Sequence, residues 1–295
     1  MILIDGWEFP IKYFPDGTLN MTALDEDGAT NNPLRELASL GPTEVAALRP
    51  EFTIQWNFED LDEQVVLWNI VHHLRFRCNA SCIDLILPYV PNARMDRTHE
   101  QFTEIHTLRY FAEFLNYLSF NAVYVLDPHS EVLVTLINNC IVLSIADLVT
   151  SAIEDFKPDY LFLPDKGALT RYGSDVIVRT PFFGDKTRDW KTGKIDGIKI
   201  INPHNVSPAK IAGKKILIID DICSKGGTFK HAAIALRHMG FGEIGLYVTH
   251  CEDTIGEGIL LSENSPISKI YATDTIYHGG DNSKVTVIPL EFTLE

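Results

Sequence analysis

Lys214 to Thr228 reads KKILIIDDICSKGGT, and this stretch decides the fold class. Its four apolar residues, 216–219, run directly into the carboxylates of Asp220 and Asp221. A continuous apolar run is typical of a strand buried on both faces of a parallel sheet. The glycine-containing loop that follows leads into a helical pattern over 229–239. The stretch therefore predicts a strand–loop–helix unit of an α/β protein.

This unit has the features of an anion site. In open parallel sheets, ligands lie beyond the carboxyl ends of the strands. Backbone N–H groups of such a loop and of the following helix start can surround a phosphate, and glycines let the backbone approach it closely. The two aspartates are placed to hold sugar hydroxyls or a metal-bound substrate. No GxxxxGK[ST] motif is present, so we interpret the unit as a site for a phosphorylated sugar rather than as a P-loop.

The rest of the chain alternates strand-like and helix-like runs, which favours a mainly parallel α/β architecture. The expected strands cover 83–88, 122–126, 160–163, 216–219 and 244–248, and the expected helices cover 104–117, 131–139, 145–156 and 229–239. Each half contains a strand that ends in polar residues, LDPH at 126–129 and IIDD at 218–221. We expect two α/β domains, 1–145 and 146–295.

Composition excludes several classes of function. The 295 residues carry 25 basic and 40 acidic side chains, a net charge of −15, which argues against nucleic-acid and anionic-membrane partners. The sequence shows no signal-peptide pattern and no long apolar run, so a cytoplasmic protein is expected. Five cysteines form no disulfide framework, and buried free thiols are expected.

The segment 182–197, FFGDKTRDWKTGKIDG, is rich in cations within an acidic chain. One interpretation is a mobile loop that closes over an anionic substrate. A solvated surface hairpin is an equally good interpretation of its composition.

Five further motifs join IIDD…GGT in a resemblance to the ribose-phosphate diphosphokinase family. YFPDGT resembles the adenine-binding FSDGE, PYVPNARMDR resembles PYxxYARQDR, and LDPH resembles the metal-binding VDLH. LPDKGALTR resembles SPDxGGxxR, and KTR at 186–188 resembles the catalytic KxR. The six matches follow the family order and span residues 13–228.

The resemblance implies an architecture and a reaction. Members have two phosphoribosyltransferase-like domains, each a mainly parallel sheet flanked by helices. They use Mg²⁺ and transfer the β,γ-diphosphoryl group of ATP to the anomeric hydroxyl of ribose 5-phosphate, which gives phosphoribosyl diphosphate and AMP. Their ATP lies near a subunit boundary, so a homo-oligomer, a dimer or larger, is expected.

The resemblance also assigns roles to residues of this chain. Catalytic cations are Lys186 and Arg188, and metal-site residues are His129 and Asp165. ATP-binding residues are Phe14, Asp16, Thr18, Arg94, Met95 and Asp96. Sugar-phosphate residues are Asp220, Asp221, Ser224, Lys225, Gly226, Gly227 and Thr228. Taken singly, several have plainer interpretations: exposed cations, a core aromatic at Phe14, a surface ion pair at Arg94 and Asp96, or a helix cap at Asp165.

Departures from the family pattern leave the substrate open. The family loop DDxxDTGGT reads DDICSKGGT here, so Ser224 and Lys225 make the loop more positive. A more cationic pocket suits a larger 5-substituent, and ADP-ribose is an alternative acceptor. Met95 and Thr18 also change hydrogen bonding near adenine. Two other classes are a phosphoribosyltransferase that consumes phosphoribosyl diphosphate, and an inactive regulatory homologue.

Overall fold

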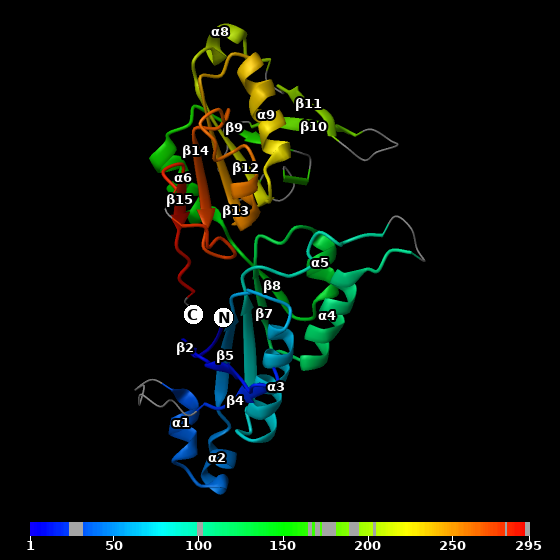
Figure 1. Cartoon of the computed structure of the whole chain (residues 1–295), viewed down its shortest axis with the longest axis vertical. Helices are drawn as coiled ribbons and strands as arrows, with labels where there is room; N and C mark the ends of the chain where they lie inside the picture. Colours follow the sequence, from blue (N-terminus) through cyan, green and yellow to red (C-terminus); the bar gives the residue numbers. More distant parts are fainter. Residues whose placement is uncertain are drawn as a thin grey trace. The chain divides into compact units, whose positions relative to one another are not determined.

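The structure is a computed structural model that describes residues 1–23, 32–98, 103–164, 167–168, 172, 181–188, 195–202, 205–280 and 282–292. Within it, the side chains of 185–188 and 195–197 are not described. The chain divides into two compact units, Met1–Leu143 and Ser144–Glu295, and each has a sheet and an apolar core of its own (Figure 1). None of the helices in this part of the chain has the length and apolar content of a membrane span.

The sheet of the first unit has six strands in the order β2-β1-β5-β6-β7-β8. These strands are β1 (Ile2–Ile4), β2 (Trp7–Glu8), β5 (Glu51–Trp56), β6 (Cys82–Leu87), β7 (Val123–Leu126) and β8 (Cys140–Leu143). From β5 to β8 all neighbours are parallel, whereas β1 is antiparallel to both of its neighbours. A separate antiparallel hairpin joins β3 (Ile11–Tyr13) to β4 (Leu19–Met21).

The described residues of this unit also form the helices α1 (Pro33–Ala38), α2 (Pro42–Leu48), α3 (Glu63–Phe76), α4 (Thr107–Leu118) and α5 (Glu131–Leu136). Apolar residues at helical spacing on α4 are buried, namely Leu108, Phe111, Ala112 and Leu115. The helix 104–117 expected from that spacing is therefore present, shifted by a few residues. Asn116 near the end of α4 donates to the carbonyl of Leu136 (2.8 Å), which places α5 beside α4.

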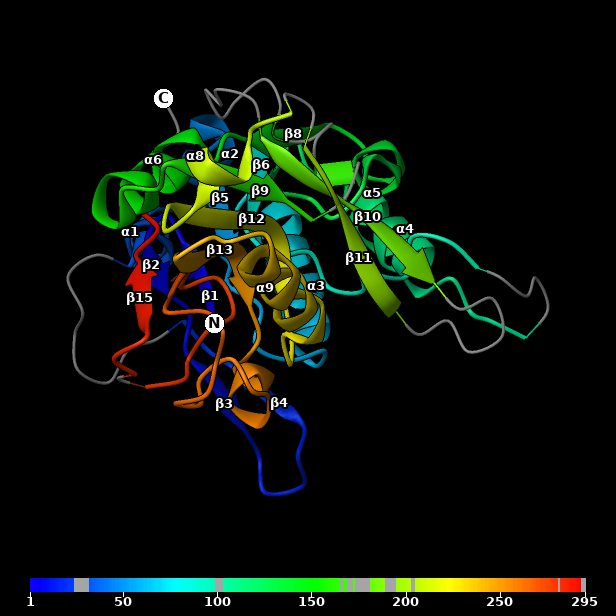
Figure 2. The ribbon, with the colours of Figure 1, turned by 90° about the horizontal axis from the view of Figure 1, so that it is seen from above.

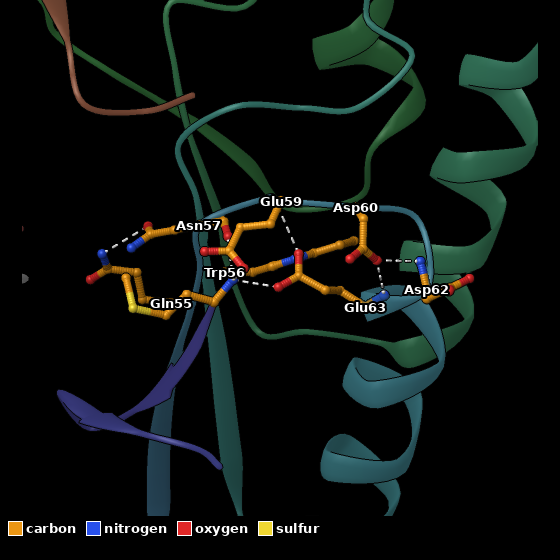
Figure 3. Close-up of polar contacts among 8 residues, drawn as sticks. Gln55, Trp56, Asn57, Glu59, Asp60, Asp62 and Glu63 are labelled. Carbon is orange, nitrogen blue, oxygen red and sulfur yellow. Dashed lines mark hydrogen bonds and ion pairs between the residues drawn. The ribbon is translucent and has the colours of Figure 1, made fainter. Parts of the chain in front are cut away.

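A buried carboxylate fixes the start of α3. Glu63 accepts hydrogen bonds from the indole Nε1 of Trp56 (2.8 Å) and from the backbone N–H of Glu59 (2.8 Å), as Figure 3 shows. The N-terminal ammonium of Met1 also contacts this carboxylate. Because a buried carboxylate is stable only when its oxygens are paired, these contacts hold α3 against β5.

The sheet of the second unit has seven strands in the order β11-β10-β9-β12-β13-β14-β15. They are β9 (Tyr160–Leu163), β10 (Phe182–Arg188), β11 (Ile195–Ile201), β12 (Lys215–Cys223), β13 (Glu243–Cys251), β14 (Lys269–Thr273) and β15 (Val285–Ile288). All neighbours are parallel except β10 and β11. The other elements are α6 (Ala146–Phe156), α8 (Pro208–Ile211), α9 (Gly227–His238) and the 3₁₀ turn η1 (Asp253–Glu257).

Strand β12 is buried on both faces, as its continuous apolar run predicts. Ile216 and Ile218 share a core with Phe229 and other residues of α9. On the opposite face lies α6, whose Phe156 stacks edge-on against Tyr271 of β14. Figure 2 shows α9 and α6 on opposite sides of β12 and β13. The predicted fold class, mainly parallel sheets flanked by helices, is confirmed.

Candidate functional site

The paired carboxylates lie within β12 rather than in a loop. The apolar run predicted a strand that ends at Ile219, but β12 continues to Cys223, because its ladder with β13 pairs Ile222 with His250 and Cys223 with Cys251. Asp220 and Asp221 are only 7% and 3% exposed. Both have polar or electrostatic partners within the structure. They therefore stand at the carboxyl end of a central strand, at the edge where ligands of such sheets bind.

The loop after β12 turns sharply into α9. Gly226 has a left-handed backbone (φ +76°), and a Cβ at this position would lie 2.2 Å from Cδ1 of Leu260. Gly227 is the first residue of α9, and a Cβ there would meet no atom within 4 Å. Among the described residues, no side chain caps the start of α9, which makes its first N–H groups suited to an anion. This geometry is compatible with a phosphate loop, and the roles of Gly226, Gly227 and Thr228 stay a prediction.

Lys225 has a partner that the sequence did not reveal. Its Nζ lies 2.6 Å from Oε2 of Glu257 in η1, and the hydrogen bond with this carboxylate raises the pKa of Lys225. The next residue, Gly258, packs on the same loop: a Cβ there would lie 2.1 Å from the carbonyl oxygen of Lys225. The extra positive charge expected at the loop is therefore offset by a carboxylate that comes from 32 residues further along the chain. A motif that ends at Thr228 carries no signal for it.

The cation-rich segment is a hairpin. Strands β10 and β11 pair antiparallel, with Lys186 opposite Ile198 and an irregularity between Thr187 and Arg188. The described backbone thus agrees with the hairpin interpretation rather than with an irregular loop. The side chains of Lys186 and Arg188, and residues 189–194, lie outside the described part of the structure.

In the first unit, Phe14, Asp16 and Thr18 form the turn of the β3–β4 hairpin. The ring of Phe14 is 50% exposed, so it is not a core aromatic. Asp16 accepts hydrogen bonds from the backbone N–H (3.0 Å) and from the hydroxyl (2.7 Å) of Thr18, and these bonds lower the pKa of Asp16. Gly17 supplies the left-handed residue that the turn needs (φ +82°). The turn therefore presents an aromatic face on a well-defined support.

Arg94, Met95 and Asp96 lie in the turns that follow β6. Arg94 and Met95 are exposed, whereas Asp96 is buried and pairs with Arg97, its chain neighbour, at 3.2 Å. Arg94 also has a polar or electrostatic partner. Of the proposed nucleotide contacts, Asp96 is the one whose carboxylate is already engaged by a cation.

Of the two predicted metal-site residues, the structure describes His129. His129 lies in the turn after β7. Asp127, the first residue of this turn, is buried and has a left-handed backbone (φ 43°). Asp165 lies outside the described residues. Among the residues that are described, no three metal-ligating side chains cluster together. The Mg²⁺ site at His129 and Asp165 therefore stays a prediction.

In the first unit, three buried side-chain atoms at helix starts lack a hydrogen-bond partner within the described structure: His106 Nε2, Thr107 Oγ1 and Ser130 Oγ. They belong to residues at the starts of α4 and α5, the helices that follow β6 and β7. In parallel sheets, these starts share the edge of the strands' carboxyl ends. Sequence reasoning missed these residues, because a lone hydroxyl or imidazole outside a motif carries no signal until the fold buries it.

The chain is similar to known proteins over most of its length. No model of a protein family matches the chain. The chain is 27% identical over 284 residues to the ribose-phosphate pyrophosphokinase of Pyrococcus abyssi, which covers 94% of this chain and 87% of that protein. It is 27% identical over 216 residues to the ribose-phosphate pyrophosphokinase of Thermococcus kodakarensis, which covers 72% of each.

A solved structure shares the fold. The crystal structure of phosphoribosylpyrophosphate synthetase from Mycobacterium smegmatis matches 77% of this chain and 73% of that chain, with a TM-score of 0.59 and 21% identity. Most of both units is therefore covered by a single known architecture.

Proposed function

Because this chain is a divergent member of the ribose-phosphate pyrophosphokinase family, we propose that it is a diphosphotransferase. It takes the β,γ-diphosphoryl group of ATP and transfers it to the anomeric 1-hydroxyl of ribose 5-phosphate. The products are phosphoribosyl diphosphate and AMP. As in the family it resembles, we expect the active form to be a homo-oligomer.

One observation carries the proposal: two buried carboxylates lie near the carboxyl end of the central strand β12, and a short glycine loop leads from this strand into the start of α9. The N–H groups at the start of α9 are suited to the 5-phosphate. Asp220 and Asp221 would then accept hydrogen bonds from the ribose hydroxyls. Two carboxylates buried near the end of a strand are costly for stability alone, and their place beside a glycine loop fits sugar-phosphate recognition.

The proposed step is an in-line displacement at the β-phosphorus of ATP by the 1-hydroxyl oxygen. Negative charge spreads over the phosphoryl oxygens, so catalysis depends on positioning and on fixed positive charge. Lys186 and Arg188 of the β10–β11 hairpin would stabilise that charge as AMP leaves. A two-stranded hairpin is a better support for such cations than an irregular loop, since the ladder limits the backbone's freedom.

The first unit would hold the nucleotide. The exposed ring of Phe14 is suited to stacking on adenine, and Arg94 to pairing with phosphate oxygens. His129 and Asp165 would contribute to the Mg²⁺ site, and bound Mg²⁺ neutralises charge on the transferred phosphates. The polar atoms of His106, Thr107 and Ser130 that lack a partner among the described residues would add hydrogen-bonding capacity at the starts of α4 and α5.

A 5-substituted ribose such as ADP-ribose is the alternative acceptor. The replacement of two family loop residues by Ser224 and Lys225 favours it. The ion pair between Lys225 and Glu257 weighs against it, because it offsets the added positive charge. The anomeric hydroxyl, and hence the reaction, is the same for both acceptors.

Two other classes of function are less well supported. A phosphoribosyltransferase that consumes phosphoribosyl diphosphate needs no second unit with an adenine-binding turn. An inactive regulatory homologue should have lost catalytic residues, but Lys186, Arg188, Asp220, Asp221 and His129 are all retained.

The decisive test measures AMP release from ATP and Mg²⁺ with ribose 5-phosphate and, separately, with ADP-ribose, followed by mass analysis of the product. We expect AMP and a diphosphorylated sugar with at least one acceptor.

Lys186→Ala should lower kcat by at least about 100-fold without loss of ATP binding, because it removes charge stabilisation only in the transition state. Lys199→Ala, an exposed lysine on the neighbouring strand β11, serves as the control and should retain activity. Near-normal turnover of Lys186→Ala, or no AMP with either acceptor, would contradict the proposal.

A further inference from the structure

A cavity in the first unit is lined by none of the residues assigned to the candidate site. It has a volume of about 420 Å³ and is bordered by α3, by β4, and by residues that flank the hairpin and α1. Figure 1 shows β4 beside α3. This volume is within the range of pockets that hold small organic ligands.

The floor of the cavity is apolar and belongs to the core. It is formed by Phe9, Leu34, Ile70 and Leu74, which are all buried. These side chains pack with the rest of the first unit's core. The floor is therefore held in place by the fold, and it offers a preformed apolar surface rather than one that a ligand must assemble.

The rim has the opposite character. Asn69, His73 and Arg77 line the cavity from one face of α3, at intervals of four residues. The guanidinium of Arg77 makes no hydrogen bond or ion pair within the described residues, although its backbone N–H bonds to the carbonyl of His73 (2.8 Å). The pKa of His73 is lowered by burial and by the charge of Arg77. No carboxylate is among the described lining residues, in a chain with 40 acidic side chains.

An apolar floor beneath a rim whose described residues carry positive charge and no carboxylate selects for one class of molecule. A neutral hydrocarbon would leave Arg77 unpaired, and a cation would be repelled by it. An inorganic anion would leave the floor exposed to water. We propose that this cavity binds an amphipathic organic anion, with its hydrocarbon body on the Phe9–Leu34–Ile70–Leu74 floor and its acidic group at His73 and Arg77.

Arg77 also stands at the C-terminal end of α3, where a cation interacts favourably with the helix carbonyls. That contribution to helix stability does not depend on what occupies the cavity. A measurement of binding therefore separates the two roles, whereas a measurement of stability does not.

The test compares three probes with the same chain length: octanoate, octan-1-ol and octylammonium. Each is titrated into the full-length protein by calorimetry at low ionic strength. We expect saturable 1:1 binding of octanoate, roughly threefold to tenfold tighter than octan-1-ol, with octylammonium weakest. Arg77→Gln should remove the preference for octanoate over octan-1-ol. Ala23→Phe, which adds a ring at a lining residue, should abolish binding of both probes.

Arg109→Gln is the matched control, because it removes an exposed arginine of α4 that does not line the cavity. It should leave all three affinities unchanged. Circular dichroism establishes that each variant is folded, and His73→Gln replaces Arg77→Gln if the latter is not. The proposal is overturned if octanoate does not saturate, if octylammonium binds as tightly as octanoate, or if Ala23→Phe leaves octanoate binding intact. None of these outcomes depends on catalytic turnover.

Discussion

Gly226 combines two demands that only glycine meets. Its backbone is left-handed, and a Cβ would lie 2.2 Å from Leu260. We expect Gly226→Ala to lower the free energy of unfolding by roughly 2–4 kcal/mol, from backbone strain and displacement of the leucine. Urea denaturation followed by circular dichroism measures this change.

Gly17 is the matched control for Gly226. It has a similar backbone (φ +82°), but a Cβ there would meet no atom within 4 Å. Gly17→Ala should therefore cost only the backbone strain, about 1–2 kcal/mol. Equal losses in the two variants would show that contact with Leu260 does not constrain the phosphate loop.

Glu257 tunes the charge beside the same loop. Removing its carboxylate by Glu257→Gln leaves Lys225 without its counter-charge, so an anion at the loop gains attraction. We expect ribose 5-phosphate to bind roughly twofold to fivefold more tightly by calorimetry, with a smaller gain at high salt.

The control for Glu257→Gln is Glu243→Gln, which breaks the pair between Lys215 and Glu243 (2.8 Å) at the opposite end of β12. This variant should leave the affinity for ribose 5-phosphate unchanged. If both variants strengthened binding equally, the effect would be one of net charge and not of the loop.

At the scale of elements, the start of α3 depends on Glu63. Its carboxylate accepts from Trp56 and from the backbone of Glu59 and contacts the N-terminal ammonium. Glu63→Gln keeps the size of the side chain but removes the charge and one acceptor oxygen. We expect a loss of roughly 2–4 kcal/mol in the free energy of unfolding, because buried partners lose their acceptor. Urea denaturation tests this value.

Glu59→Gln provides the comparison for Glu63→Gln. Glu59 is exposed and forms an ion pair with the same ammonium at 3.3 Å. Its substitution should change stability by no more than about 0.5 kcal/mol, since an exposed ion pair contributes little. If both variants lost a similar free energy of unfolding, the ion pairs with the N-terminal ammonium, and not the buried hydrogen bonds of Glu63, would be the source of the stabilisation.

Element prediction succeeded where apolar spacing was strong and failed where polar residues extend an element. The strand expected at 160–163 has the bounds of β9, and the helix expected at 145–156 begins one residue later in α6. Strand β12, in contrast, runs four residues past its apolar run. Pairing with β13 extends the strand through Asp220 and Asp221, and β13 comes later in the chain, so the local apolar pattern does not predict this extension.

At the scale of the whole molecule, each unit has a core of its own. We expect residues 1–143 expressed alone to unfold cooperatively on heating, because the strands that surround its core all come from this stretch. Residues 1–118, which lack β7 and β8, should not fold, since Leu85 and its neighbours in β6 would lose a partner strand. Circular dichroism and amide hydrogen exchange distinguish these outcomes. A non-cooperative transition of residues 1–143 would contradict this division.

The sequence by itself determined the α/β class, the order of the main elements and the loop at Gly226, because these depend on local apolar spacing and on motifs within about fifteen residues. Only the tertiary structure decided that Glu257 offsets Lys225 and that Phe14 is exposed. It also buried polar atoms of His106, Thr107 and Ser130 that have no hydrogen-bond partner among the described residues. It also decided that a cationic rim lies over an apolar cavity. Each of these brings together residues from different elements, and burial and pairing exist only once the chain has folded.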